Sequence, residues 1–243
     1  MGTKYKYNPI VEALCEFRFE PQEEWDLTIP GLVFEQVREI FPNRRRARTV
    51  SVELSPEQAN VLEVNRVQFV REDETAMVQV GPNLVAVNQL KPYSSWEEFS
   101  PLIMRGLEAY TAVAGPQTIN RIALRYINHI RFPGRRVELE DYFQFRPTQG
   151  PDLPEDFIAF VTAIMFPFDG ERDLLRTHLA TLPFGAPDTS VISLDLEYFL
   201  ARPGEVSLVD VPGWIQTAHA RIESTFEACM TPRLRTLFQK GGE

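Results

Sequence analysis

Residues 120–132 read NRIALRYINHIRF, and their side chains alternate between apolar and basic. Successive side chains of a β-strand point to opposite faces, so one face of this segment is apolar and the other carries cations. The apolar face comprises Ile122, Leu124, Tyr126, Ile130 and Phe132, and the basic face comprises Arg121, Arg125, His129 and Arg131. This pattern predicts a strand of an antiparallel sheet with one buried face.

The composition is that of a globular chain, with 243 residues, 44% hydrophobic and 24% charged residues. The net charge of −9 argues against general nucleic-acid binding, which needs clustered Lys and Arg to replace phosphate counterions. Two cysteines, Cys15 and Cys229, provide no disulfide framework. No run approaches the roughly 20 apolar residues of a membrane helix, and the N-terminal segment lacks a signal-peptide pattern. We therefore expect a cytoplasmic protein without membrane association.

Alternation and helical spacing predict the remaining elements. In the first half we expect strands at 10–19, 47–54, 67–73, 76–82 and 84–90, a helix between Pro30 and Pro42, and a helix at 95–113 that opens with a Ser95–Glu98 capping box. In the second half we expect strands at 118–132, 156–166, 172–182 and 190–202, a short helix near 137–143, and a closing helix from Pro212. Two segments that overlap these strands, 155–164 and 170–182, are also compatible with helices.

Both halves follow the order strand, helix, antiparallel meander, long helix. This repeated order predicts an α+β fold with two pseudo-repeats, 1–115 and 116–243, whose helices cover one face of a curved, saddle-like or helix-grip-like sheet. The alternative is an α+β chain whose halves are similar by chance. Fold class by itself assigns no function.

Two segments carry a family resemblance. The first is YNPIVEALCEFRF at residues 7–19, and the second is RIALRYINHI at residues 121–130. They resemble the NPPIxE…EFRF-like opening strand and the central LRYxNxI strand of a sporadically distributed, uncharacterised prokaryotic family of about this length. The first segment has a single proline, Pro9, before Ile10 and Val11, where the family pattern has two. The resemblance implies no activity, cofactor or catalytic residue, and the patchy distribution suggests mobile or antiviral defence loci.

The charged faces of three strands form the principal candidate site. If the first strands of the two halves pair, carboxylates lie opposite arginines, whose planar guanidinium groups can bind a carboxylate bidentately. The candidate binding residues are Glu12, Glu16, Arg121, Arg125, His129, Asp195 and Glu197. Such a set either holds the strands in register, at about 0.2–1 kcal/mol per cross-strand pair, or forms a binding site.

A second cationic feature follows the first expected helix. We expect a loop there that carries Arg44, Arg45, Arg46 and Arg48. It is either a small patch for an acidic partner or a solvated loop.

The common catalytic motifs are missing: the sequence contains no GxSxG, Walker A, GxGxxG or HExxH pattern, and its three histidines lack metal-ligand spacing. We therefore expect a non-enzymatic module that binds another protein, with no cofactor and no metal. One alternative is a nucleic-acid-binding accessory factor that uses the Arg-rich loop and the basic strand face. A second alternative is a metal-dependent hydrolase or nuclease built on Glu12, Glu16, Asp195 and Glu197.

Overall fold

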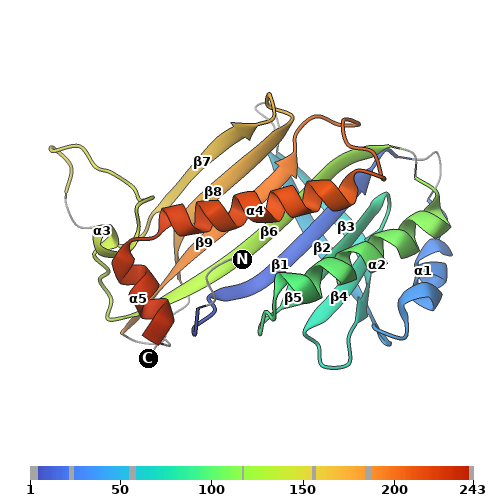
Figure 1. Cartoon of the computed structure of the whole chain (residues 1–243), viewed down its shortest axis with the longest axis horizontal. Helices are drawn as coiled ribbons and strands as arrows, with labels where there is room; N and C mark the ends of the chain where they lie inside the picture. The colour runs from blue at the N-terminus through green and yellow to red at the C-terminus, as the bar shows by residue number, and fades with distance from the viewer. Residues whose placement is uncertain are drawn as a thin grey trace. The chain divides into compact units, whose positions relative to one another are not determined.

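The residues that the structure describes form an antiparallel sheet of nine strands with five helices, which confirms the α+β class (Figure 1). The computed structural model describes residues 5–21, 25–54, 59–116, 118–154, 157–183 and 188–240, apart from the side chains of 48–54, 59–65 and 240. The strands are β1 (Ile10–Phe19), β2 (Asn43–Leu54), β3 (Ala59–Val70), β4 (Ala76–Gly81), β5 (Leu84–Leu90), β6 (Ile119–Pro133), β7 (Val161–Phe168), β8 (Asp173–Leu182) and β9 (Thr189–Leu200). The helices are α1 (Ile29–Val37), α2 (Trp96–Ala114), α3 (Leu139–Tyr142), α4 (Val211–Cys229) and α5 (Pro232–Lys240).

The hydrogen-bonded strand order is β2-β3-β4-β5-β1-β6-β9-β8-β7. Two compact units divide the chain. Unit 1 comprises the residues up to Ala13, Leu124–Ala201 and those from Val211 onward; unit 2 comprises Leu14–Ala123 and Arg202–Asp210. Strands β1 and β6 therefore contribute residues to both units.

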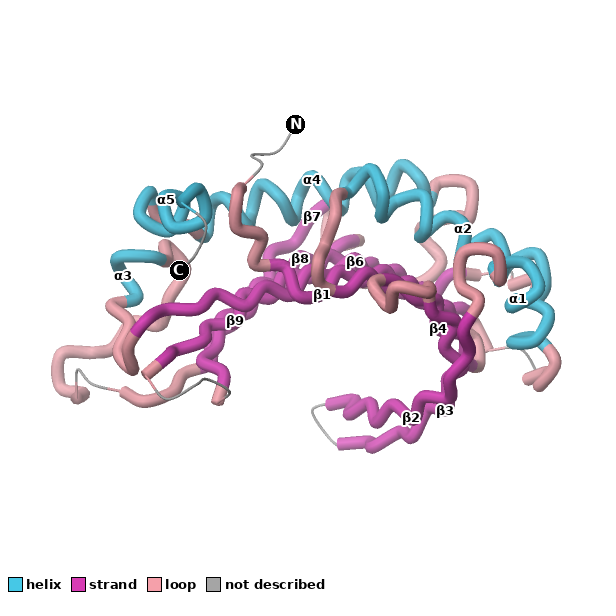
Figure 2. Tube along the Cα trace, turned by 90° about the horizontal axis from the view of Figure 1, so that it is seen from below, coloured by secondary structure: helices cyan, strands magenta, loops and turns pink. Residues whose placement is uncertain are grey.

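In unit 2, α1 and α2 pack on one face of the strands (Figure 2). The N-cap of α2 is Ser95, whose Oγ accepts a hydrogen bond from the backbone N–H of Glu98 at 3.3 Å, as the sequence pattern predicted. The helix ends at Gly115, whose φ of 57° suits a residue without a Cβ. At the centre of α2, a Cβ on Gly106 would lie 2.6 Å from a methyl group of Val87, so the small residue allows the helix to approach the sheet closely.

In unit 1, α4 packs on β9, and α5 contacts α3 (Figures 1 and 2). The apolar side of α4 is buried as its spacing predicted, with Ile215, Ala218 and Ile222 among its buried residues. Of the two segments that were also compatible with helices, 170–182 contains β8, whereas of the described residues in 155–164 only 161–164 belong to a strand, β7, so the expected strand at 156–166 begins too early. Tertiary pairing decides this: β8 lies between β7 and β9, and all three have antiparallel register.

The prediction of a loop at Asn43–Arg48 is wrong, because these residues form the first half of β2. Each has a partner in β3, from Asn43 opposite Val70 to Arg48 opposite Asn65. Because successive side chains of an extended strand point to opposite faces, Arg45 points away from the face that carries Arg44 and Arg46. The run therefore does not present its cations as one patch.

Candidate functional site

One face of the strands in unit 1 carries several of the predicted site residues. On β9, Tyr198 contacts Trp214 of α4, so the alternate residues Asp195 and Glu197 lie on the face that points away from that helix. The register of β8 and β9 places a basic residue of β8 opposite each of these acids. We define the ion-pair face as Arg125, Arg176, His178, Asp195 and Glu197.

Arg125 of β6 and Asp195 of β9 form the central contact of the ion-pair face. The guanidinium Nε donates to Asp195 Oδ1 at 2.8 Å, and Nη2 donates to Oδ2, which makes the pair bidentate. The Asp195 side chain is only 9% exposed, whereas that of Arg125 is 33% exposed. The hydrogen bond to Asp195 raises the pKa of Arg125, with smaller contributions from Glu197 and Glu12, so this cation stays charged.

The second contact of the ion-pair face joins β8 to β9. Arg176 Nη2 lies 2.7 Å from Glu197 Oε2, and the two residues are directly opposite in the register. His178 is the cross-strand partner of Asp195. Arg176 and His178 are not among the predicted site residues, although they alternate with Leu175 and Leu179 in DLLRTHLATL and this parity places them on the polar face.

The predicted residues lie in both units. Glu12 and His129 belong to unit 1 with Arg125, whereas Glu16 and Arg121 belong to unit 2. In unit 2, Glu16 Oε1 accepts from Arg18 Nε at 2.7 Å, and Glu16 Oε2 lies 3.2 Å from Arg66 Nη1 of β3. The predicted set is therefore divided between the two units.

The arginines of β2 have separate surroundings. Arg44 stacks over the ring of Phe34 in α1, with its guanidinium carbon 4.7 Å from the ring centroid. Arg45 points to the other face and makes an exposed salt bridge to Glu74 at 3.1 Å. Arg46 is exposed on the Arg44 side, and the side chain of Arg48 lies outside the described residues.

A buried carboxylate that the sequence analysis missed joins α4 to the sheet. Asp173, at the start of β8, is 0% exposed. Its Oδ1 accepts from Trp214 Nε1 at 3.0 Å, and its Oδ2 accepts from the Tyr198 hydroxyl at 3.1 Å and from Arg172 Nη2 at 2.6 Å. We call these four side chains the Asp173 node. Asp173 points to the same buried face of β8 as Leu175 and Leu179. An acidic residue in the apolar alternation of this strand is a sequence signal of a buried carboxylate.

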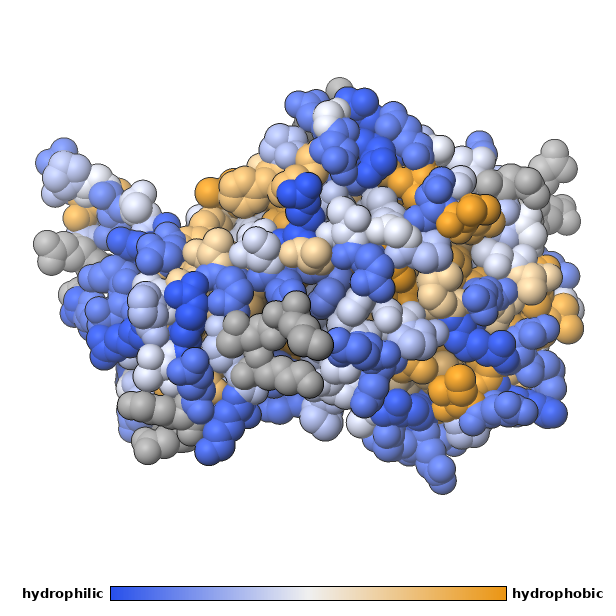
Figure 3. Space-filling view, in the orientation of Figure 1, coloured by the Kyte–Doolittle hydropathy of each residue, from blue (hydrophilic) through white to orange (hydrophobic). Residues whose placement is uncertain are grey.

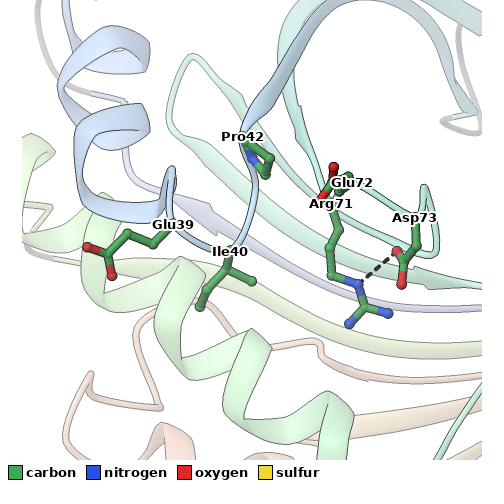
Figure 4. A pocket seen from close by; sticks show the side chains of 6 residues that line it. All are labelled: Glu39, Ile40, Pro42, Arg71, Glu72 and Asp73. Atoms are coloured by element: carbon green, nitrogen blue, oxygen red, sulfur yellow. Dashed lines mark hydrogen bonds and ion pairs between the residues drawn. The ribbon is translucent and has the colours of Figure 1, made fainter.

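Figure 4 shows an open depression in unit 2, between the end of α1 and the turn from β3 to β4. Its lining residues are Glu39, Ile40, Pro42, Arg71, Glu72 and Asp73. Arg71 Nε donates to Asp73 Oδ1 at 2.9 Å, and this hydrogen bond lowers the pKa of Asp73. The depression includes none of the predicted site residues.

Strand β7 carries a concentration of exposed apolar side chains. Val161 and Met165 are 71% and 59% exposed, and Ile164 and Phe166 are exposed on the other face of the strand. Phe157 and Ile158, just before the strand, are also exposed. Figure 3 shows an apolar patch over the position that β7 occupies in Figure 1. We call residues 157–166 the β7 strip.

The described ranges, with their gaps, contain no group of three or more His, Cys, Asp or Glu side chains arranged to hold a metal ion. Among the helices of the same ranges, none has both the length and the apolar character of a membrane span. Searches found no protein family and no curated protein that matches the chain.

Proposed function

We propose that the chain is a non-enzymatic protein-interaction module that binds its partner by strand addition at the free edge of β7. The observation that carries this proposal is an uncharged strand with exposed apolar side chains on both faces at the end of the sheet. Unpaired edge strands usually carry charges, bulges or a covering segment that prevents pairing with other chains. An exposed apolar patch of this kind on a soluble domain marks an interaction surface.

The hydrogen-bond pattern shows which backbone groups face outward. Thr181 N donates to Phe160 O at 3.1 Å, and the register continues from that pair through Thr162 opposite Leu179 and Ile164 opposite Thr177. In an antiparallel ladder, alternate residues bond to the neighbouring strand. The even-numbered residues of β7 therefore bond to β8, and the odd-numbered residues point their N–H and C=O groups to the outer edge.

Those outward residues are Val161, Ala163, Met165 and Pro167. The first three offer a donor and an acceptor each, whereas Pro167 has no N–H and limits pairing at its end of the strand. Partner backbone groups would supply affinity through main-chain hydrogen bonds, and apolar contacts on both faces would add burial. This arrangement suits an extended segment of a protein.

In this proposal the ion-pair face stabilises the sheet that presents β7. Arg176 and Arg125 each bind an acid of β9, so the contacts run from β8 through β9 to β6. The nearly buried acids are therefore neutralised by partners within the unit, as expected for side chains that hold strands in register.

We also infer that the two halves arose by duplication. The strand order supports this: β2-β3-β4-β5-β1 in the first half corresponds to β7-β8-β9-β6 in the second, with the first strand of each half at the centre. The first half has one more strand in its meander.

A photocrosslinking amino acid at position 163 tests the proposed function in cells of the native host. We expect covalent adducts with a protein from the exposed position 163 and none from position 209, where Val209 is 88% exposed in unit 2. A Met165→Lys change in the same chain should abolish the adduct. Identical adducts from both positions, or none from either, would refute binding at this edge.

A further inference from the structure

We infer that the free edge of β7 pairs with β7 of a second copy of this chain, antiparallel and centred on Ala163. This inference rests on the proposed function, because it names the occupant of the same edge. The outward hydrogen-bonding groups, the charges and the apolar area of the β7 strip all favour this occupant.

The positions of the outward groups are self-complementary. When two β7 strands pair about Ala163, Val161 of each copy lies opposite Met165 of the other, and Ala163 lies opposite itself. Each of these three opposed pairs can exchange both N–H···O=C bonds. Pro167, the outward residue without an N–H, falls outside this central segment. Both copies then contribute the same donors and acceptors, as a twofold interface requires.

The side chains also match about this centre. Val161 and Met165 share one face of the strand with Ala163. The twofold axis therefore places Val161 of each copy beside Met165 of the other copy on that face. The small side chain of Ala163 meets its own copy at the axis without a clash. On the other face, Ile164 lies opposite Thr162, and Phe166 lies opposite Phe160.

Charge favours a second copy in spite of the net charge of −9. Like charges directly opposite each other destabilise a strand pair, and residues 157–168 contain no Asp, Glu, Lys or Arg. The arginine of the adjacent β8, Arg176, binds Glu197. Pairing of β7 with itself therefore sets no like-charged residues of the strip against each other.

The apolar area is of the size that a dimer needs. Six large apolar side chains of the strip are 41% to 100% exposed. At about 150–200 Å² for a large side chain, they expose on the order of 600 Å² per copy. A specific interface buries about 800 Å² per partner, and the paired backbone and the rim of the strip add to the side-chain area.

Light scattering coupled to gel filtration of the purified chain is the first measurement. We expect a dimer for the wild type and for Val209→Lys, and a monomer for Val161→Lys and for Met165→Lys. All three positions are more than half exposed, so the substitutions leave the fold intact, which circular dichroism checks. A wild-type monomer at every concentration, or a dimer that survives both β7 changes, would overturn the inference.

Cysteine crosslinking then tests the centre of the pairing. In an antiparallel hydrogen-bonded pair the two Cα atoms are about 5.5 Å apart, within the range of a disulfide. Ala163→Cys should give a covalent dimer under mild oxidation, and Val209→Cys should not. The native Cys15 and Cys229 are buried, and burial raises the pKa of both thiols, so the background is low.

The two proposals fail separately. If the purified chain is monomeric and the Ala163→Cys variant does not crosslink, the self-pairing inference is wrong. A photocrosslinked adduct at position 163 with a different protein would still support strand addition at β7. If position 163 captures nothing in cells, and the chain is monomeric, both proposals are wrong.

Discussion

The Asp173 node should contribute more to stability than any surface ion pair of the chain, and Asp173→Ala tests this. The substitution removes the acceptor of the Trp214 N–H and of the Tyr198 hydroxyl, both of which are buried. A buried donor that loses its partner costs about 1–3 kcal/mol. Arg172 is 31% exposed and also binds Asp169, so water can solvate its charge and its share of the loss is small.

We therefore expect Asp173→Ala to lower the free energy of unfolding by about 3–5 kcal/mol. For a chain of this size, about 2–4 °C of melting temperature corresponds to each kcal/mol, so the transition should fall by about 6–20 °C. Asp173→Asn should cause a smaller loss, because its oxygen can still accept from Trp214 while its amide nitrogen cannot accept from Tyr198 or Arg172.

Asp169→Ala is the matched control, because Asp169 binds the same arginine from an exposed position. It should cost about 0–1 kcal/mol. Urea unfolding followed by circular dichroism and tryptophan fluorescence gives the three free energies, provided that the slopes agree. If Asp173→Ala costs no more than Asp169→Ala, or if Asp173→Asn matches the wild type, the node does not hold α4 on the sheet in the way we describe.

Three further predictions concern the ion-pair face, the two long helices and unit 2. Arg125→Ala should lower the free energy of unfolding by about 1–3 kcal/mol, because it leaves the nearly buried Asp195 without its bidentate partner. The double variant Arg125→Ala/Asp195→Ala should recover part of that loss in urea titrations. Gly106→Ala should destabilise the protein by about 1–3 kcal/mol, because the added Cβ clashes with Val87 of the sheet. Gly213→Ala, where nothing lies within 4 Å of an added Cβ, should stabilise α4 by about 0.5–1 kcal/mol. Equal effects of the two variants in thermal melts would contradict the close approach of α2 to the sheet. Burial raises the pKa of Tyr110 to about 12, above the unfolded value of about 10. Its contribution to the free energy of unfolding is therefore fully present below pH 10 and is lost as the pH rises toward 12. Tyr110→Phe should reduce this loss of stability at alkaline pH, as measured by urea titrations at several pH values.

Local patterns predicted most of the elements because they depend on short-range physics. The alternation in NRIALRYINHIRF correctly predicted β6 with one buried face, and the Ser95–Glu98 spacing correctly predicted the N-cap of α2. The segments 155–164 and 170–182 remained open between helix and strand, because short apolar runs satisfy both periods. Pairing with neighbouring strands decided them, and β2 extended into the expected Arg44–Arg48 loop for the same reason.

The candidate site was predictable only in part. Charge and parity identified Arg125 and Asp195 as members of one polar face, but their bidentate contact depends on which strands are neighbours. Asp173 remained unnoticed because its partners come from a strand and a helix far along the chain. The apolar residues of β7 are compatible with a buried strand, but the tertiary structure places this strand at the end of the sheet with its side chains exposed.

Side-chain periodicity within single segments was therefore sufficient to predict the α+β class, the faces of the strands and the buried side of α4. Periodicity does not predict which charges meet, which carboxylate is buried or which strand lies at the end of the sheet. These properties depend on strand order and register, which join residues 25 to 70 positions apart in the chain. In this protein the proposed function depends on the last of them, the free edge of β7.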